Sequence, residues 1–398
     1  MRKTSMLFPL CAALALLGCG SESSGDGQGT VEGSDDGGES TGSGNGTPGP
    51  DVTTFETALH DRVVDYNEAL RTASLKLNRR LPTLAQIRAV ETAADPKAEY
   101  ELQLDAMFAD PAFHTRMIKW WKDAMRQGGG AANGAPSRDT APVLAARITS
   151  EGRPFSELFT ASSNTCPTYD SASDTFVDGE CDNGVPTHAG VLTNPGVMYQ
   201  FYGNMAFRRV RWLQEVFVCT KFPAEYSETP ISKGGSDYVS PWEFETVGTS
   251  PVDFQDTKSV ICANCHTTIN HIAPLFGVFD ANGQFTSGIA VMTPSVPDPV
   301  QTQLSHWLRD GETTAWRFGQ PVADLVELGA AVADDPDVHE CVVARMWNFV
   351  MSKEDIVTDL STVPTEVLQR YKDEFYASDQ NLKATLRKMF VSDDFVRF

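Results

Sequence analysis

The sequence predicts a mainly α-helical fold with long irregular loops and little β-structure. Apolar residues recur every three or four positions through most of residues 53–398, the spacing of helices with one buried face. Several of these runs begin with helix-start signals, such as the capping-box pattern at 83–86 and the acid before a proline at Asp95 and Asp110. Strand patterns are scarce, and we expect only a short ribbon near 284–293.

The expected helices are separated by recognisable breaks. The first apolar run extends from Phe55 to Leu77 behind Thr53 and Thr54, which are good capping residues. Residues 161–190 and 220–253 are rich in turn residues or prolines, so we expect loops there. Further helices are expected after Thr83, Asp95 and Asp110, and at about 141–160, 195–219, 301–310, 321–333, 337–352, 364–377 and 380–391.

Composition excludes several classes of protein. A chain of 398 residues with 41% hydrophobic residues can bury one large core or two moderate ones, which excludes a disordered protein or a disulfide miniprotein. A net charge of −21 argues against nucleic acid as a partner, because a polyanion would be repelled. No apolar run reaches the 18 or more residues that a membrane-spanning helix requires.

The N-terminus has the pattern of an export signal. Arg2 and Lys3 precede an apolar stretch that ends at Leu16-Leu17-Gly18-Cys19, which resembles the lipobox of bacterial lipoproteins. In that resemblance residues 1–19 are the signal with its lipobox, and cleavage before Cys19 makes the lipidated Cys19 the first residue of the mature chain. Gly20 in place of an aspartate favours the outer membrane. Residues 20–52 are rich in glycine, serine and acids, so they are expected to form a flexible tether. The alternatives are an ordinary secretory signal, or a buried helix with a chance cysteine.

Cys262-Ala-Asn-Cys265-His266 has the C-x-x-C-H pattern of c-type haem attachment. Two thiols one helical turn apart can add to the two vinyl groups of one porphyrin, and the adjacent imidazole can then ligate the iron. The alternatives are a plain disulfide or a redox dithiol, although the βαβ pattern of a thioredoxin is missing. Zinc would require a second ligand pair, and none is evident in the sequence.

The segment from Cys262 to Phe285 resembles the planctomycete-type cytochrome c domains of unknown function. The likeness extends to the flanking helical segments and covers most of residues 75–398. It implies one covalent haem c, and it divides the chain into parts of distinct role. After the signal and tether these are an N-terminal helical module at 53–135, a central helical module with a cysteine-stapled loop at 136–253, the haem segment at 254–320 and a C-terminal helical module at 321–398. Within the haem segment, the residues that match the pattern after the attachment motif are Pro274, Phe276, Gly277, Phe279, Asp280 and Gly283.

His266 is the expected proximal iron ligand. For the sixth position the sequence offers Met292, which lies 26 residues downstream beside a threonine and a proline. His271 and His306 are the alternatives, and an open position is a third. His339 lies on an expected helix, where a structural role is the commoner one.

Four further cysteines are expected to form two structural disulfides, because export places them in an oxidising compartment. Three pairings are possible. The favoured one joins Cys166 to Cys181 across a short polar loop and Cys219 to Cys341 between two helices, since it links near neighbours and connects the resembling modules. Three arginines, Arg208, Arg209 and Arg211, would either meet haem propionates or form a solvated helix face.

The expected function is one-electron transfer by a lipid-anchored monohaem cytochrome of the cell envelope. Its partner would be an unidentified redox protein, with membrane contact only through the lipid. One alternative is a haem enzyme of peroxidase-like or other small-molecule oxidoreductase type, with an open sixth position. The other is a non-haem surface lipoprotein stapled by disulfides. We predict no catalytic side chain, because no Ser-His-Asp order, phosphate loop or paired-carboxylate spacing is evident.

Overall fold

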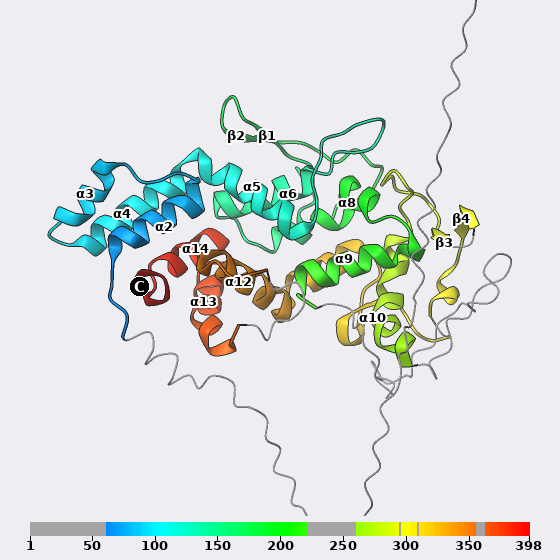
Figure 1. Ribbon diagram of the computed structural model, residues 1–398. Helices are drawn as coiled ribbons and strands as arrows, with labels where there is room; N and C mark the ends of the chain where they lie inside the picture. Colours follow the sequence, from blue (N-terminus) through cyan, green and yellow to red (C-terminus); the bar gives the residue numbers. More distant parts are fainter. Residues whose placement is uncertain (1–60, 221–259, 294–295, 309, 356–362) are drawn as a thin grey trace, which may run out of the picture. The chain divides into compact units, whose positions relative to one another are not determined.

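The computed structural model describes residues 61–220, 260–293, 296–308, 310–355 and 363–398, and side chains in these ranges except at a few positions, notably 260–267. The expected mainly helical fold is confirmed (Figure 1). Cys19 and the expected signal and tether lie outside the described residues. Within the described ranges, no helix is both long and apolar enough to cross a membrane.

The N-terminal helices begin where the start signals predict. These are α2 (Tyr66–Asn78), α3 (Leu84–Thr92), α4 (Pro96–Ala109) and α5 (Pro111–Met125). Thr83 forms the capping box of α3, and Asp95 and Asp110 cap α4 and α5. The first run is not one continuous helix, because residues 61–65 are not helical; its earlier part lies outside the described residues. The backbone of Val63 pairs with that of Phe398, so Asp65 caps the helix instead.

Two expected helices are each divided in the structure. The stretch 141–160 becomes α6 (Thr140–Glu151) and α7 (Glu157–Thr160), because Gly152 terminates α6 in a left-handed conformation. The stretch 195–219 becomes α8 (Pro195–Gln200), the 3₁₀ turn η2 (Asn204–Ala206) and α9 (Phe207–Phe217). Met205 and Ala206 both have positive φ, which interrupts the helical path before α9.

The C-terminal region is mostly helical. The expected helices at 321–333, 337–352, 364–377 and 380–391 are present, whereas a helix at 301–310 is not. Gln301 instead pairs with Ala290 in a hairpin, and only a 3₁₀ turn, η4 (Leu304–His306), follows. The helices are α10 (Val260–Phe276), α11 (Leu325–Ala333), α12 (Pro336–Met351), α13 (Thr365–Ala377), α14 (Leu382–Phe390) and α15 (Asp393–Val396).

The described strands form three separate antiparallel pairs rather than one sheet. The ribbon expected near 284–293 is present, shifted toward the C-terminus, as the second pair. The pairs are β1 (Thr168–Asp170) with β2 (Thr175–Val177), β3 (Ala290–Thr293) with β4 (Val296–Gln301), and β5 (Ala315–Trp316) with β6 (Gln320–Pro321).

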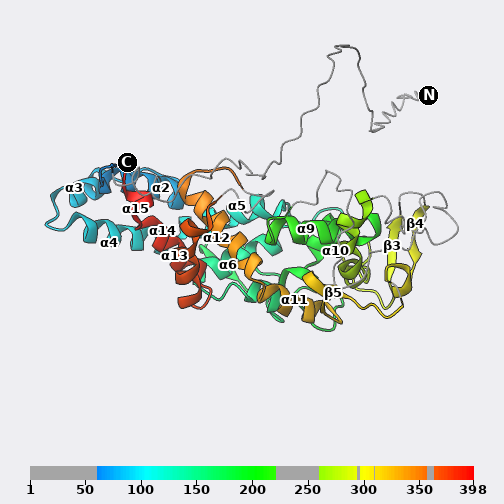
Figure 2. The ribbon, with the colours of Figure 1, turned by 90° about the horizontal axis from the view of Figure 1, so that it is seen from below.

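The helices share one hydrophobic core that joins the two ends of the chain. Helix α12 packs on α9, α13 and α14, and α14 and α15 return to α4 and α2 (Figure 2). The buried Tyr100 hydroxyl donates to the Phe390 carbonyl at 2.8 Å. Trp121, Phe155, Phe159 and Phe217 continue the core through ring contacts. The C-terminal helices α14 and α15 therefore bury apolar side chains against the N-terminal helices α4 and α2.

Candidate functional site

Helix α10 carries the C-x-x-C-H pattern. Cys262, Cys265 and His266 are the third, sixth and seventh residues of this 17-residue helix, so their backbone positions fall within little more than one turn. Their side chains are among those outside the described set. In its described half, α10 buries Ile269, Ile272 and Phe276, and it packs against α9, η2 and β5.

Arg209 fixes the C-terminal end of α10. Arg209 is 1% exposed, and its N–H groups donate to four carbonyl oxygens from two parts of the chain. Nη1 reaches the carbonyls of Phe276 (2.6 Å) and Phe279 (3.2 Å), Nε and Nη2 reach that of Met198 (3.1 and 2.7 Å), and Nη2 reaches that of Asp280 (3.2 Å). Burial lowers the pKa of Arg209 to about 9. The guanidinium thus caps the helix that carries the C-x-x-C-H sequence.

The three neighbouring arginines do not act as one group. Arg208 is exposed and donates to the Tyr202 carbonyl at 3.1 Å, and Arg211 pairs with Glu215 at 2.7 Å on the same helix. Arg209 is buried, and backbone carbonyls accept from its N–H groups, so the expected solvated helix face is wrong for this residue. Nothing local in the sequence shows that α10 ends beside it.

The Phe279-Asp280…Gly283 pattern forms a docked turn. Asp280 Oδ1 accepts from the amides of Asn282 (2.8 Å) and Gln284 (2.9 Å), and Phe279 is buried. The Gly283 carbonyl accepts from Nδ2 of the buried Asn183 at 3.1 Å. This pattern therefore positions backbone rather than contributing a reactive group.

Replacing Gly283 with alanine is expected to lower the free energy of unfolding by about 3 kcal/mol. Gly283 has a φ of +73°, and a Cβ there would overlap the Pro195 carbonyl oxygen. Gly311→Ala is the matched control, because Gly311 has a φ of +89° but open space around it. The free energy of unfolding of Gly311→Ala should fall by only about 1 kcal/mol, the cost of placing alanine in this backbone conformation. Equal losses in urea denaturation would contradict the packing argument.

An apolar cavity of about 450 Å³ borders the C-terminal end of α10. Its lining includes Pro274, Leu275 and Val278 from the end of α10 and the turn after it, together with Phe285 and Leu325 from later segments. Apolar lining of this kind lowers the local dielectric constant beside the helix.

The candidate sixth ligands lie on separate elements. Met292 is half-buried in β3, where the strand register shifts, and the preceding Ala290 amide donates to the Gly277 carbonyl just beyond α10. His271 lies on α10 itself, with Nε2 3.7 Å from a carboxylate oxygen of Glu312. Met292 and His271 are thus carried by different elements, β3 and α10.

His306, the third candidate ligand, and His339 lie on other elements again. His306 is in η4, where Nδ1 accepts from the Gln303 amide at 3.3 Å. The buried His339 contacts the Ala333 carbonyl through Nε2 at 2.7 Å and the Tyr376 hydroxyl through Nδ1 at 3.0 Å. Burial lowers the pKa of His339, in keeping with a neutral core histidine.

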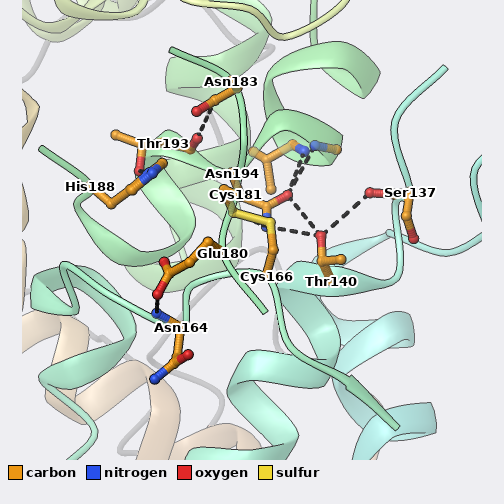
Figure 3. Close-up of a disulfide and its surroundings, with 12 residues drawn as sticks. Ser137, Thr140, Asn164, Cys166, Glu180, Cys181, Asn183, His188, Thr193 and Asn194 are labelled. Carbon is orange, nitrogen blue, oxygen red and sulfur yellow. Dashed lines mark hydrogen bonds between the residues drawn. A yellow bond between two sulfur atoms is a disulfide. The ribbon is translucent and has the colours of Figure 1, made fainter. Parts of the chain in front are cut away.

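Both favoured disulfides are present. Cys166 and Cys181 are joined with a Cα–Cα distance of 5.0 Å, and Cys219 and Cys341 with one of 5.5 Å. Figure 3 shows Asn194 beside the first bridge, where its Nδ2 lies 3.4 Å from Cys166 Sγ. The same side chain caps α8, so this disulfide ties the polar loop to a helix start.

Within the part of the chain that the structure describes, no three His, Cys, Asp or Glu side chains gather as a metal site. No family model, curated protein or solved structure matches the chain.

Proposed function

We propose that this protein is a monohaem c-type cytochrome, anchored by a lipid on Cys19 in the bacterial outer membrane, that transfers single electrons. The observation that carries the proposal is the C-x-x-C-H sequence on one continuous helix, α10. Cys262 and Cys265 would hold the porphyrin covalently, and His266 would ligate the iron.

The cysteine inventory supports this assignment. Of the eight cysteines, four are paired in the two disulfides, one lies in the expected signal and one is the expected lipidation site. Cys262 and Cys265 are the pair that remains, and a histidine follows them directly. Two thiols within one turn and an adjacent imidazole match the donor set that haem c requires.

The chain's own residues would hold the ligating helix rigid. Arg209 caps the end of α10, and Asn270 Nδ2 donates to the Trp307 carbonyl at 3.2 Å from the middle of the helix. A bound haem would supply reversible one-electron exchange at iron. A rigid, largely apolar setting suits that exchange, because little has to reorganise when the charge changes.

The proposal predicts a visible haem spectrum that depends on two cysteines. Protein made in a periplasm with haem-attachment machinery should show a Soret band that survives acid–acetone extraction. The Cys262→Ser/Cys265→Ser variant should lose it entirely, because no thioether can form. The control is Cys166→Ser/Cys181→Ser, which removes as many cysteines elsewhere, in a disulfide, and should keep the band.

The same preparation tests the sixth ligand. With Met292 on the iron, the reduced wild type should exclude carbon monoxide and Met292→Ala should bind it. Rapid binding by the wild type would favour the haem enzyme instead. A colourless wild type would contradict the cytochrome proposal and leave a disulfide-stapled lipoprotein.

A further inference from the structure

A second cavity, of about 350 Å³, lies among α2, α5, α12 and the residues that follow α12. Its lining contains more cations than carboxylates, although the whole chain carries a net charge of −21. The cations are Lys76, Arg116, Arg345 and Lys353, and the carboxylates are Asp123 and Asp355.

Both carboxylates of this cavity already have cationic partners. Oδ1 of Asp355 accepts a hydrogen bond from Nη1 of Arg345 at 2.7 Å. Oδ2 of Asp123 lies 3.0 Å from Nζ of Lys119, a residue that is not part of the lining. The positive charge of the remaining cations is therefore only weakly offset by these two acids.

Lys76 and Arg116 donate to neutral groups. Lys76 Nζ donates to the Phe349 carbonyl at 2.8 Å and to the Ser352 hydroxyl at 2.6 Å. Arg116 Nε donates to the Lys76 carbonyl at 2.9 Å, and its guanidinium lies 5.0 Å above the Phe349 ring. Burial, with a smaller effect of Arg116, lowers the pKa of Lys76 to about 8.

Two buried donors of the lining lack acceptors among the described residues. These are Nε of Arg345 and Nδ2 of Asn348, on side chains that are each 3% exposed. A buried donor without an acceptor costs about 1–3 kcal/mol, and more when it is charged. Neither atom has appreciable accessible surface, so both lie behind the cavity wall, and the wall itself presents the excess positive charge.

We propose that this cavity binds a small oxyanion, with a phosphate or carboxylate group held by the guanidinium and ammonium groups of its wall. The accessible cations of the lining are Lys76, Arg116 and Lys353, and an oxyanion among them would offset their uncompensated charge. The site is independent of the proposed haem, since it lies on α2, α5 and α12 rather than on α10.

The test is calorimetric titration of the full-length protein at low ionic strength with inorganic phosphate and, separately, with succinate. We expect saturable binding of one anion per chain for at least one probe. Lys353→Gln should weaken it about tenfold, because Lys353 is an exposed cation of the lining. Lys97→Gln removes the same charge from an exposed position on α4, outside the lining, and should change the affinity less than twofold.

Binding of phosphate alone would assign a phosphate group, and binding of succinate alone a carboxylate. Saturable binding of neither probe would overturn the proposal. Equal weakening by Lys97→Gln and Lys353→Gln would overturn it too, because only general charge attraction would then be involved. Circular dichroism of each variant shows that the fold is intact.

Discussion

Replacing Arg209 with methionine is expected to lower the free energy of unfolding by about 3–5 kcal/mol. Methionine keeps much of the apolar stem, so the change removes mainly the guanidinium. The carbonyls of Met198, Phe276, Phe279 and Asp280 then lose a shared buried donor. Each such group costs about 1–3 kcal/mol when left unpaired, although some of these carbonyls have a second partner.

Arg208→Met is the control for this prediction. Arg208 is the preceding residue of the same helix, is exposed and makes one hydrogen bond at 3.1 Å. Its replacement should cost less than about 1 kcal/mol. Chemical denaturation followed by circular dichroism measures both variants. Similar losses for the two arginines would contradict the role assigned to Arg209.

Removing the Cys219–Cys341 disulfide is expected to cost more stability than removing Cys166–Cys181. The first bridge closes a separation of 122 residues and the second one of 15. In the chain-entropy description these correspond to about 5 and about 3 kcal/mol, because a longer closed loop restricts the unfolded chain more.

Paired cysteine-to-alanine variants measure the difference. Cys219→Ala/Cys341→Ala and Cys166→Ala/Cys181→Ala are unfolded in urea without reductant, alongside the wild type. A reductant should then destabilise each variant less than it destabilises the wild type, since one bridge is already missing. The account would fail if the Cys166–Cys181 variant lost as much stability as the other.

The helix starts could be predicted because they depend on neighbouring residues. Thr83, Asp95 and Asp110 each satisfy the first amides of their own helix, so the signal and its effect lie within three residues. The disulfide pairing could also be favoured from the sequence, because Cys166 and Cys181 are near neighbours and Cys219 and Cys341 lie at the ends of expected helices.

Features that depend on distant contacts could not be predicted. Arg209 caps a helix that ends 67 residues later, and no local pattern reveals that partnership. The expected helix at 301–310 failed because Gln301 pairs with Ala290, and pairing across a turn overrode helical spacing. The cation-lined cavity likewise joins Lys76 to Arg345 from opposite ends of the sequence.

For the proposed site, the sequence supplies the candidate residues, and the structure shows the contacts around the helix that carries them. C-x-x-C-H is a local pattern, so Cys262, Cys265 and His266 could be named without a fold. The Phe279…Gly283 pattern was recognised through resemblance, yet its role as a docked turn becomes evident only from Asn183 and Pro195.

Peptide mass analysis of the exported protein tests the cytochrome proposal most directly. A protease digest should contain one peptide that spans Cys262 to His266 and carries the added mass of a single haem, with two thioether bonds. The same peptide from Cys262→Ser/Cys265→Ser should have its unmodified mass. A wild-type peptide with no added mass, or one whose two cysteines are joined only to each other, would contradict the proposal.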